Sequence, residues 1–488
     1  MSRGWDTPFL AVAETHSGVV VLSADRAHKV KKPVVTGFLD FSTPARRRAA
    51  LERELVLNRR LAADVYLGVV GVDDPLGGEA EPVLVMRRMP AELRLATMVT
   101  GGEAVDAHLV ALAHLVADFH GTARRGPDVD AEGGVDALRE RWGDNVEQAR
   151  GLGVLDGALV DEVAQLVTRY LDGRGPLLAL RVAQGCIVDG HADLIAEDVF
   201  CLPDGPRVLD CLDFDDRLRF VDRLDDVAFL AMDLEHLGRP GLAADFLRDY
   251  ALAAGETVAA PTSLVHHYTA YRAFVRAKVE CLQHTQGRTG AAGQAQGYAD
   301  LALRHLRAGS VRLVLVGGLP GTGKSTVAAA LAAELGAVVL SSDVLRAELR
   351  AAGEIAGVGG TVDAGAYSAT AKNRVLTELL ERAGVQLGLG RSVVLDASWT
   401  SAADRARAVA LGGRTCSAVT ELRCVATEQV AAERIQLRPP GPSEATPEVA
   451  AAMARAADPW PAAVELDTTA PLPSTVGGAL RAVLRPAR

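Results

Sequence analysis

The segment Gly318–Thr326, which reads Gly-Leu-Pro-Gly-Thr-Gly-Lys-Ser-Thr, constrains the fold of this chain more than any other. It matches the pattern G-x-x-x-x-G-K-[ST] completely. The apolar run Leu313–Val316 before it is typical of a buried strand, and the Ala- and Leu-rich segment Val327–Leu335 after it is typical of a helix. A strand, a glycine-rich loop and a helix in this order predict a Walker A loop, or P-loop, that wraps phosphate groups.

Each residue type in this loop has a chemical reason. Glycines allow consecutive backbone N–H groups to point at phosphate oxygens, and the start of the helix adds partial positive charge. We expect Lys324 to reach the β- and γ-phosphates of a nucleotide and the Ser325 hydroxyl to ligate Mg²⁺. The alternative is a glycine-rich turn before an ordinary helix, but the chain has only six lysines, so a lysine here is unusual. The residues of this loop predicted to bind nucleotide are Gly318, Gly321, Thr322, Gly323, Lys324, Ser325 and Thr326.

Composition limits the size class and the kinds of partner. With 488 residues the chain is too long for one hydrophobic core, which predicts two or three domains. The formal net charge of −10 argues against nucleic acid or an anionic membrane as the main partner. Six cysteines without metal-binding spacing are typical of reduced thiols. No secretory signal pattern and no uncharged run of about 18 residues is present, so we expect a cytoplasmic protein without a membrane span.

The sequence pattern changes near residue 308, and we place a domain boundary between residues 1–307 and residues 308–488. Downstream, apolar runs such as Val393–Leu395 alternate with helical stretches such as Lys372–Leu387, which predicts an α/β domain with a doubly wound parallel sheet. Upstream, paired strands and the amphipathic helix Pro44–Leu61 come first, and mostly helical patterns follow. The first domain is therefore predicted to be α+β, with a small sheet lobe and a larger helical lobe.

Two aspartates follow strands of the predicted parallel sheet, Asp343 after the second strand and Asp396 after the third. Carboxyl ends of neighbouring strands face the same crevice, so we expect Asp343 near the γ-phosphate held by Lys324. There it can take a proton from an acceptor hydroxyl or hold Mg²⁺, while Arg346 orients an anionic group or neutralises charge. We expect Asp396 to support the Mg²⁺ shell. The structural alternatives are a helix cap at Asp343 and an ordinary strand-end turn at Asp396.

Two arginines four residues apart, Arg434 and Arg438, precede a loop rich in proline and glycine. This spacing places them on one helical face. They fit a lid whose guanidinium groups stabilise the transition state of phosphoryl transfer, and a solvated helix face explains them equally well.

Together with the phosphate loop, Ser342-Asp343-x-x-Arg346 and Val394-Leu395-Asp396 make residues 311–466 resemble the P-loop kinases of small molecules. That group includes gluconate kinase and chloramphenicol phosphotransferase. In it, the aspartate after the second strand is commonly the residue nearest the acceptor hydroxyl, and the resemblance implies this place for Asp343. A ring-forming mechanical ATPase fits less well, because the region is short.

A second set of acids lies in the first domain. His191-Ala192-Asp193 is followed by Asp198, and then by Asp210 and Asp213. Protein-kinase-like enzymes place a catalytic base in an H-x-D segment, a metal-binding residue five positions on, and another metal-binding Asp after the next hairpin. This spacing predicts Asp193 as the base and Asp198 as a metal ligand. The second metal ligand is either Asp210 or Asp213, and the Phe that follows favours Asp213; the alternative for His191 and Asp193 is a hydrogen-bonded pair in a loop.

Residues 15–305 resemble the aminoglycoside phosphotransferase-like family, whose fold is protein-kinase-like. The resemblance implies that Lys29 or Lys31, on a strand of the small lobe, contacts the nucleotide phosphates, with Glu54 as the helix partner of that lysine. It also implies that an aspartate of Asp225–Asp226 braces the catalytic loop.

The chain departs from the usual family segment H-G-D-L-H-x-x-N at three positions, which are Ala192, Ile195 and Asp198. Aspartate still ligates Mg²⁺, but its charge changes the electrostatics of the site. Two possibilities therefore remain for the first domain, namely phosphotransfer or a relic that binds a nucleotide or another ligand.

The combination of both domains looks like the bacterial bifunctional proteins that join an aminoglycoside phosphotransferase-like domain to a P-loop ATP-binding domain. The resemblance implies an ATP- and Mg²⁺-dependent phosphotransferase that acts on a hydroxyl of a small molecule such as a sugar, amino sugar or antibiotic. The second domain is the better supported catalyst. The competing hypothesis is an ATP-responsive binding or regulatory protein with a degenerate first domain. The sequence leaves the acceptor and the oligomeric state open.

Overall fold

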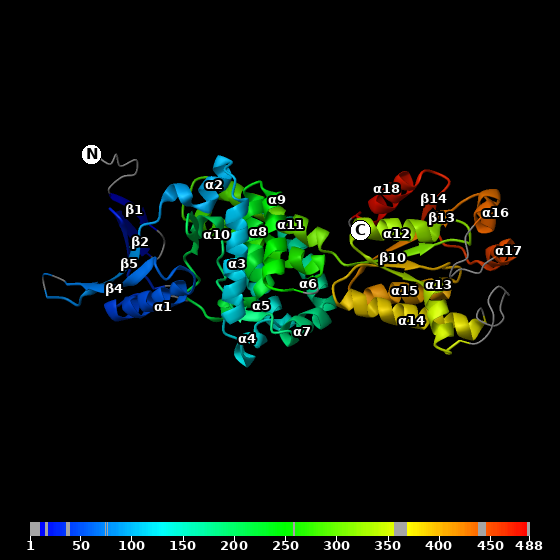
Figure 1. The fold of residues 1–488 in the computed structure, drawn as a ribbon, viewed down its shortest axis with the longest axis horizontal. Coiled ribbons are helices and arrows are strands. Elements are labelled where there is room, and N and C mark those ends of the chain that lie inside the picture. The colour runs from blue at the N-terminus through cyan, green and yellow to red at the C-terminus, as the bar shows by residue number, and fades with distance from the viewer. Residues whose placement is uncertain are drawn as a thin grey trace. The chain divides into compact units, whose positions relative to one another are not determined.

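The computed structural model describes residues 10–14, 18–35, 40–73, 75, 77–256, 259–355, 368–437 and 446–485. Its contacts divide the chain into two compact units, whose elements are labelled in Figure 1. The first unit comprises Met1–Val160, Ala179–Ala259 and Tyr268–His305, and the second comprises Asp161–Leu178, Ala260–His267 and Leu306–Arg488. Two segments that precede residue 306 in the sequence therefore belong to the second unit. Among the described residues, no helix is long and apolar enough to cross a membrane.

An antiparallel sheet with the strand order β1-β2-β3-β5-β4 forms the small lobe of the first unit. Helix α1 (Pro44–Ala62) begins at Thr43, whose hydroxyl accepts a hydrogen bond from the Arg46 amide. The helix packs on the sheet through the fully buried Leu51, and the core between them includes Leu84 and Met86 of β5. The strands are β1 (Leu10–Glu14), β2 (Gly18–Ser23), β3 (Arg26–Lys31), β4 (Tyr66–Val72) and β5 (Glu81–Arg87).

The larger lobe of the first unit is mainly helical. Helix α8 (Arg223–His236) runs through its interior, and every residue from Leu224 to Leu234 is buried. Two short antiparallel pairs flank the segment that carries Asp193 and Asp198; they are β6 (Ile187–Asp189) with β9 (Phe220–Asp222), and β7 (Val199–Leu202) with β8 (Gly205–Val208). The other helices before residue 309 are α2 (Leu95–Gly101), α3 (Asp106–Thr122), α4 (Pro127–Ala131), α5 (Val135–Leu152), α6 (Gly157–Gly173), α7 (Gly175–Ala183), α9 (Pro240–Ala253), α10 (Thr262–Thr285) and α11 (Ala291–Ala308). The α+β fold predicted for this part, a small sheet lobe followed by a larger helical lobe, is confirmed.

The second unit contains a parallel sheet with the strand order β11-β12-β10-β13-β14. In Figure 1, α12 and α18 cover one face of this sheet, and α14 and α15 cover the other. The predicted doubly wound α/β fold is therefore confirmed. The strands are β10 (Arg312–Gly317), β11 (Val338–Ser341), β12 (Val393–Asp396), β13 (Ala418–Val425) and β14 (Val464–Asp467). The helices are α12 (Lys324–Leu335), α13 (Ser342–Ala351), α14 (Ala369–Gly388), α15 (Ala402–Arg414), α16 (Glu428–Leu437), α17 (Pro447–Ala456) and α18 (Leu472–Val483).

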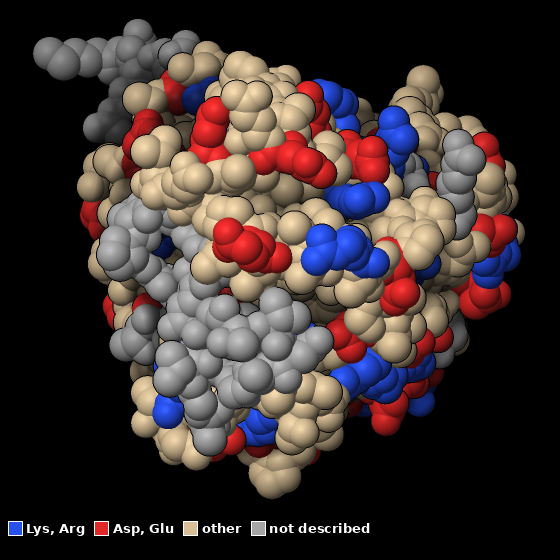
Figure 2. All heavy atoms as spheres, turned by 90° about the vertical axis from the view of Figure 1, so that its right-hand side faces the viewer, with Lys and Arg blue, Asp and Glu red and all other residues tan. Residues whose placement is uncertain are grey.

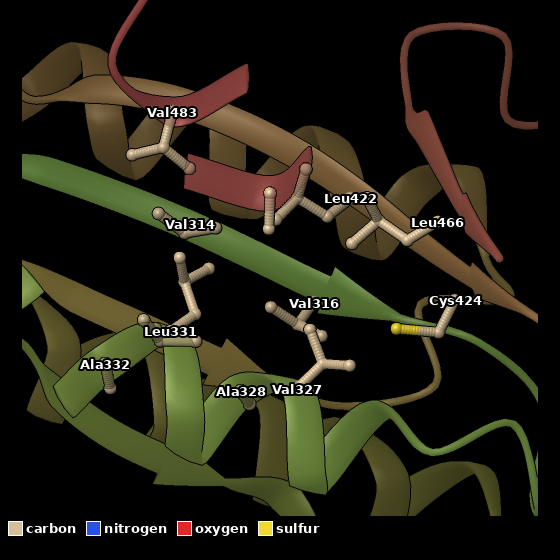
Figure 3. Packing of buried hydrophobic residues seen from close by; sticks show 12 residues of the cluster. Val314, Val316, Val327, Ala328, Leu331, Ala332, Leu422, Cys424, Leu466 and Val483 are labelled. Atoms are coloured by element: carbon tan, nitrogen blue, oxygen red, sulfur yellow. The ribbon is translucent and has the colours of Figure 1, made fainter. Parts of the chain in front are cut away.

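A buried apolar cluster fixes the two elements on either side of the phosphate loop. Val314 and Val316 of β10 pack with Val327 and Leu331 of α12 in this cluster (Figure 3). Side chains of β13, β14 and α18 complete it, among them Leu422, Leu466 and Val483. Because the strand and the helix are both held by the core, the loop between them has fixed ends.

The two earlier segments of the second unit make buried polar contacts inside that unit. Arg174 is 1% exposed, and its guanidinium donates to the backbone oxygens of Leu387 and Thr415, the latter at 2.7 Å. The Ser263 hydroxyl donates to Gly390 O at 2.7 Å. These contacts add buried side-chain hydrogen bonds to backbone carbonyl groups at the end of α14 and after α15.

Candidate functional site

The phosphate loop adopts a backbone that requires glycine. Gly318, Gly321 and Gly323 have φ angles of 143°, 83° and 80°, which lie in the region that other residues rarely adopt. Space is also limiting, because a Cβ on Gly318 would lie 2.5 Å from Thr322 Oγ1, and a Cβ on Gly321 would lie 2.4 Å from Ala431 O. Helix α12 begins directly at Lys324, so its free N–H groups face the loop. Residues Gly318–Lys324 thus adopt the loop conformation that the sequence pattern predicts.

One hydrogen bond within the loop and hydrogen bonds with two other segments hold it in this conformation. Gly318 N donates to Ser398 O at 3.2 Å, and the Thr322 hydroxyl donates to Leu319 O at 2.8 Å. The hydroxyl of Thr468, which directly follows β14, donates to Thr322 O at 2.7 Å. Sequence reasoning missed Thr468, because β14 lacks the apolar run of a buried strand.

Because this loop is confined on both sides, we predict that Gly321→Ala weakens MgATP binding by the second unit at least tenfold. A Cβ at this position meets the backbone of α16. A strained backbone costs about 1–3 kcal/mol. A loss of about 1.4 kcal/mol in binding free energy raises the dissociation constant about tenfold. Isothermal titration with MgATP measures the change. Gly336→Ala is the matched control, because Gly336 also has a positive φ, of 58°, but no atom within 4 Å of its Cβ position. Equal affinity of the two variants would contradict the prediction.

Asp396 lies at the centre of the predicted catalytic residues. In the sheet it is paired with Val316 of β10 on one side and with Ser341 of β11 on the other. Burial raises its pKa, the nearby Lys324 and hydrogen bonds with Ser325 and Ser341 lower it, and the negative charge of Asp343 raises it. All four groups therefore lie within electrostatic or hydrogen-bond reach of one carboxylate. The structure brings together the acid at the end of β12, the acid after β11 and the lysine and serine of the phosphate loop.

Asp343 does not act as a helix cap. Helix α13 begins after Ser341, and no side-chain cap bond is formed there. The Asp343 carboxylate instead accepts a hydrogen bond from Arg346 Nη1 at 2.6 Å, and its side chain is 24% exposed. Asp343 therefore combines a fixed orientation with access to solvent, as a group that meets a substrate must.

The donor set in the second unit fits a Mg²⁺ ion that arrives with a nucleotide. Asp396 is 4% exposed, and its Oδ1 atom has no hydrogen-bond partner, which is costly unless a ligand or water satisfies it. The Ser325 side chain, on the first turn of α12, supplies a hydroxyl oxygen beside it. Over the described ranges, no group of three His, Cys, Asp or Glu residues could hold a metal. Phosphate oxygens and water would therefore supply the remaining ligands, as is usual for Mg²⁺.

Of the two predicted lid arginines, the structure places Arg434 beside the phosphate loop. Its Nη2 atom donates to Thr468 O at 2.8 Å, and its Nη1 atom lies 3.5 Å from where a Cβ on Gly323 would be. Arg434 therefore contacts the segment that braces the loop. Arg438 lies outside the described residues.

In the first unit, Asp226 holds the loop that carries Asp193. Its carboxylate is fully buried and accepts hydrogen bonds from the amides of His191 and Ala192, both at 2.7 Å, and pairs with His120 Nε2 at 3.0 Å. Ala192 has a positive φ of 67°, and Arg272 donates to its carbonyl at 3.1 Å. The bracing role that the family resemblance implied for this acid is confirmed by these contacts.

The structure groups Asp193 and Asp198 with Asp210 rather than with Asp213. Burial raises the pKa of Asp193 to about 6, and the charge of Asp210 contributes to the rise. Burial also raises the pKa of Asp198 well above its usual range, and Asp210 and Asp193 raise it further. The Asp213 carboxylate instead pairs with Lys31 at 3.0 Å. Of the two candidates that the sequence left open, Asp210 is the acid next to the other two.

Lys29 and Lys31 both form an ion pair with Glu54. The predicted pairing of a strand lysine with Glu54 of the helix is therefore made by both candidates. Lys29 Nζ lies 2.6 Å from Glu54 Oε1, and Lys31 Nζ lies 2.9 Å from Glu54 Oε2. Lys29 also lies 3.1 Å from Asp210. We call the series Asp210, Lys29, Glu54, Lys31 and Asp213 the charge chain. A partly exposed lysine beside two acids fits a triphosphate and its metal ion.

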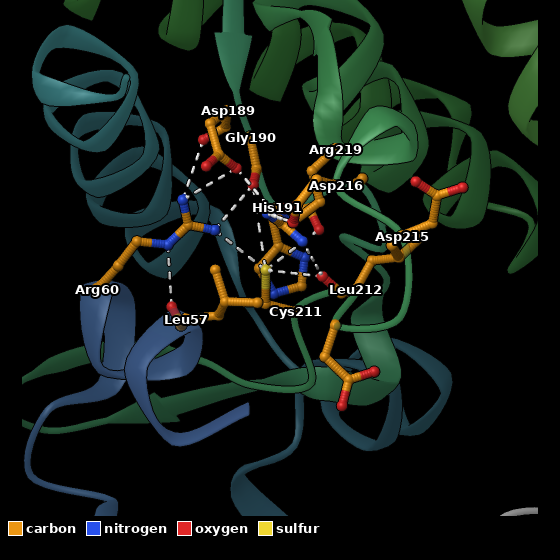
Figure 4. Close-up of polar contacts among 12 residues, drawn as sticks. Leu57, Arg60, Asp189, Gly190, His191, Cys211, Leu212, Asp215, Asp216 and Arg219 are labelled. Carbon is orange, nitrogen blue, oxygen red and sulfur yellow. Dashed lines mark hydrogen bonds and ion pairs between the residues drawn. The ribbon is translucent and has the colours of Figure 1, made fainter. Parts of the chain in front are cut away.

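Helix α1, which carries Glu54, is bonded directly to the segment just before His191 and to the loop around Asp213. Figure 4 shows Arg60 of α1 reaching Asp189 O at 3.1 Å and Gly190 O at 2.9 Å. Asn58 Oδ1 accepts from the Cys211 amide at 2.8 Å, and Arg53 donates to Asp213 O at 2.9 Å. Sequence reasoning gave these three residues no role, because their partners lie far away in the sequence.

Charged residues of both signs are mixed on the face drawn in Figure 2. In the second unit, one ion pair links α13 to α14 and two lie within α14. Arg382 lies 2.7 Å from Glu348 and 2.9 Å from Glu378, and Arg374 lies 3.0 Å from Glu378.

Comparison with known proteins gives one family and several solved kinase structures. A family model described as an AAA domain matches residues 313–460. An uncharacterized protein of Mycobacterium tuberculosis (strain ATCC 25618 / H37Rv) is 48% identical over 476 residues, which are 97% of this chain and 95% of that protein. An uncharacterized protein of Mycobacterium bovis matches to the same extent.

The solved structures are similar to one or the other part of the chain. A gluconokinase from Sinorhizobium meliloti 1021 is 21% identical, covers 36% of this chain and 91% of its own, and has a TM-score of 0.27. A choline kinase from Cryptosporidium parvum Iowa II is 12% identical, covers 62% of this chain and 91% of its own, and has a TM-score of 0.41.

Proposed function

The chain belongs to the family of the mycobacterial proteins that match it over nearly their whole length, and we propose for it the function that its own geometry supports best. This function is ATP-dependent transfer of the γ-phosphoryl group to a hydroxyl of a small molecule, such as a sugar, an amino sugar or an antibiotic. The second unit is the catalyst. The proposal includes Mg²⁺ as the metal ion and a cytoplasmic location.

One observation supports the proposal above all others, namely the convergence of Lys324, Ser325, Ser341 and Asp343 on the buried Asp396. In the proposed mechanism, backbone amides of the phosphate loop and Lys324 bind the β- and γ-phosphates. Ser325 and Asp396 would hold Mg²⁺, which would supply positive charge against the phosphate oxygens.

The acceptor is activated by Asp343. Its carboxylate, which Arg346 orients at 2.6 Å, takes the proton from the acceptor hydroxyl as the oxygen attacks the γ-phosphorus. The bond from the γ-phosphorus to the β–γ bridging oxygen breaks, and ADP leaves. The Arg434 guanidinium, beside the phosphate loop, adds positive charge near the transferring group.

ATP consumption by the purified chain across a panel of sugars, amino sugars and aminoglycosides tests this function. Parallel assays of Lys324→Ala and Asp193→Ala assign any activity to the second or the first unit. If neither substitution lowers acceptor-dependent turnover, both site assignments fail.

A second candidate function follows from Asp198. It replaces the asparagine usual in the aminoglycoside phosphotransferase-like family and lies buried with Asp193 and Asp210, which raises its pKa. The negative charges of these three neighbouring aspartates oppose their full ionisation and disturb the metal site. This favours a first unit that binds nucleotide and responds to it without turnover. MgATP binding by the Lys324→Ala chain without any loss of γ-phosphate would support this alternative.

If the first unit does transfer phosphate, its rate should fall on the acid side near pH 6. The pKa of Asp193 is raised to about 6 by burial, and a general base is lost when it is protonated, which happens below that pH. The measurement is the pH dependence of kcat/KM for the Lys324→Ala chain. A flat profile between pH 5 and pH 7 would exclude Asp193 as the base.

A further inference from the structure

The charge chain of the first unit contains one lysine more than a nucleotide site requires. Lys29 and Lys31 stand two residues apart on β3, so their side chains point to the same face of the sheet. Each lysine pairs with a different oxygen of Glu54, Lys29 at 2.6 Å and Lys31 at 2.9 Å. The Glu54 side chain is 1% exposed, and burial alone would raise its pKa, but the two lysines outweigh burial and hold it below its usual range.

The two lysines differ in their surroundings. Lys29 is 17% exposed and faces Asp210, the acid that lies with Asp193 and Asp198. Lys31 is 5% exposed, faces Asp213, and lies 5.4 Å from the centre of the Phe41 ring. Lys29 is therefore the lysine that a phosphate can reach, and Lys31 lies on the protected side of Glu54.

A buried carboxylate resists the loss of its last cation. Removing one partner of a buried ion pair leaves an uncompensated charge in a medium of low dielectric constant. If Lys29 were the sole cation beside Glu54, a movement of Lys29 toward a phosphate group would leave the buried Glu54 carboxylate uncompensated. Phosphate binding would then be weakened by that free-energy cost. With Lys31 in place, Glu54 keeps a cation at 2.9 Å while Lys29 shifts toward the phosphate.

We propose that Lys31 is a positioning residue, which keeps Glu54 compensated so that Lys29 can exchange Asp210 for the phosphates of a nucleoside triphosphate. This inference rests on the proposed binding of nucleotide by the first unit. It assigns Lys29 to the phosphates, Asp210 and Asp198 to the metal ion, and the Lys31–Asp213 pair to the support of Glu54.

The test is the affinity of the full-length Lys324→Ala chain for a fluorescent ATP analogue with Mg²⁺, so that the phosphate loop of the second unit does not contribute. We expect Lys31→Met to weaken binding about tenfold, which is within the range found for coupled charge pairs. Lys31→Arg should restore most of the affinity, because it restores the cation. Lys32→Met is the matched control, since Lys32 follows directly and pairs with Glu14 at 2.6 Å; it should leave affinity unchanged.

A double-mutant cycle shows whether Lys31 acts through Glu54. In the Glu54→Gln background, there is no charge left to compensate, and we expect Lys31→Met to cause no further loss. An equal loss with and without Glu54→Gln would show a merely structural role and overturn the inference, as would a Lys31→Met variant that binds like Lys32→Met.

The outcome also separates this inference from the function on which it rests. If the Lys324→Ala chain binds no nucleotide at all, nucleotide binding by the first unit fails and the inference fails with it. If it binds nucleotide and the Lys31 variants behave as described for a structural role, the binding proposal stands and only the role of Lys31 is overturned.

Discussion

Replacing Lys324 with alanine should lower acceptor-dependent ATP consumption by the second unit by about 10²–10³-fold, the loss seen when one preorganised charge stabiliser is removed from an active site. Lys324 is the first residue of α12, and its charge acts on the buried Asp396 next to Asp343. Its ammonium is the group placed to neutralise the phosphate oxygens. Steady-state turnover with the best acceptor of the panel measures the effect.

The matched control for this prediction is Lys32→Ala, which also removes a lysine but breaks the pair with Glu14 on the sheet of the first unit. It should leave turnover within a factor of about two, since exposed ion pairs contribute little. A Lys324→Ala chain that turns over as fast as this control would remove the phosphate loop from the mechanism.

Asp226→Ala should destabilise the first unit by about 3–5 kcal/mol, the cost of breaking a buried charge pair by removing one partner. The substitution leaves the amides of His191 and Ala192 and the ring of His120 without their acceptor. The hydrogen bonds to Asp226 also hold its pKa below the usual range against the effect of burial. The stability that ionised Asp226 gives the folded state is therefore fully present above the pKa of an unfolded aspartate. It is lost as the pH falls through the lower pKa that Asp226 has in the folded state.

Hydrogen exchange at the amides of His191 and Ala192, together with urea unfolding of the first unit, measures the effect of Asp226→Ala. Asp245→Ala is the control, because Asp245 is 48% exposed and pairs with Arg248 on the surface of α9. The control should change stability by less than about 1 kcal/mol. Unchanged protection of the two amides in Asp226→Ala would show that the loop does not depend on this carboxylate.

The site of the second unit was predictable from the sequence because each part of it is local. A strand, a glycine loop and a helix specify the cradle at Gly318–Lys324, and acids at the ends of parallel strands specify Asp343 and Asp396. The bracing residue Thr468 was not predictable in this way. It follows β14, a short edge strand whose residues are mostly exposed and which therefore lacks the apolar run of a buried strand.

In the first unit, the sequence predicted the participants of the site but not how they are paired. Alternation along a strand puts Lys29 and Lys31 on one face, so either lysine fits Glu54, and the structure shows that both reach it. The choice between Asp210 and Asp213 depends on long-range contacts. Strand β4 was missed, since it contains two glycines and lies at the edge of its sheet.

The segments Asp161–Leu178 and Ala260–His267 have a practical consequence for dissecting this protein. A truncation that starts at residue 308 would delete Arg174 and Ser263, which donate hydrogen bonds to Leu387 O, Thr415 O and Gly390 O. The truncated piece would lose these hydrogen bonds, which the intact polypeptide forms. No single cut yields both halves complete, and their chemistry is best separated by point substitutions in the uncut chain.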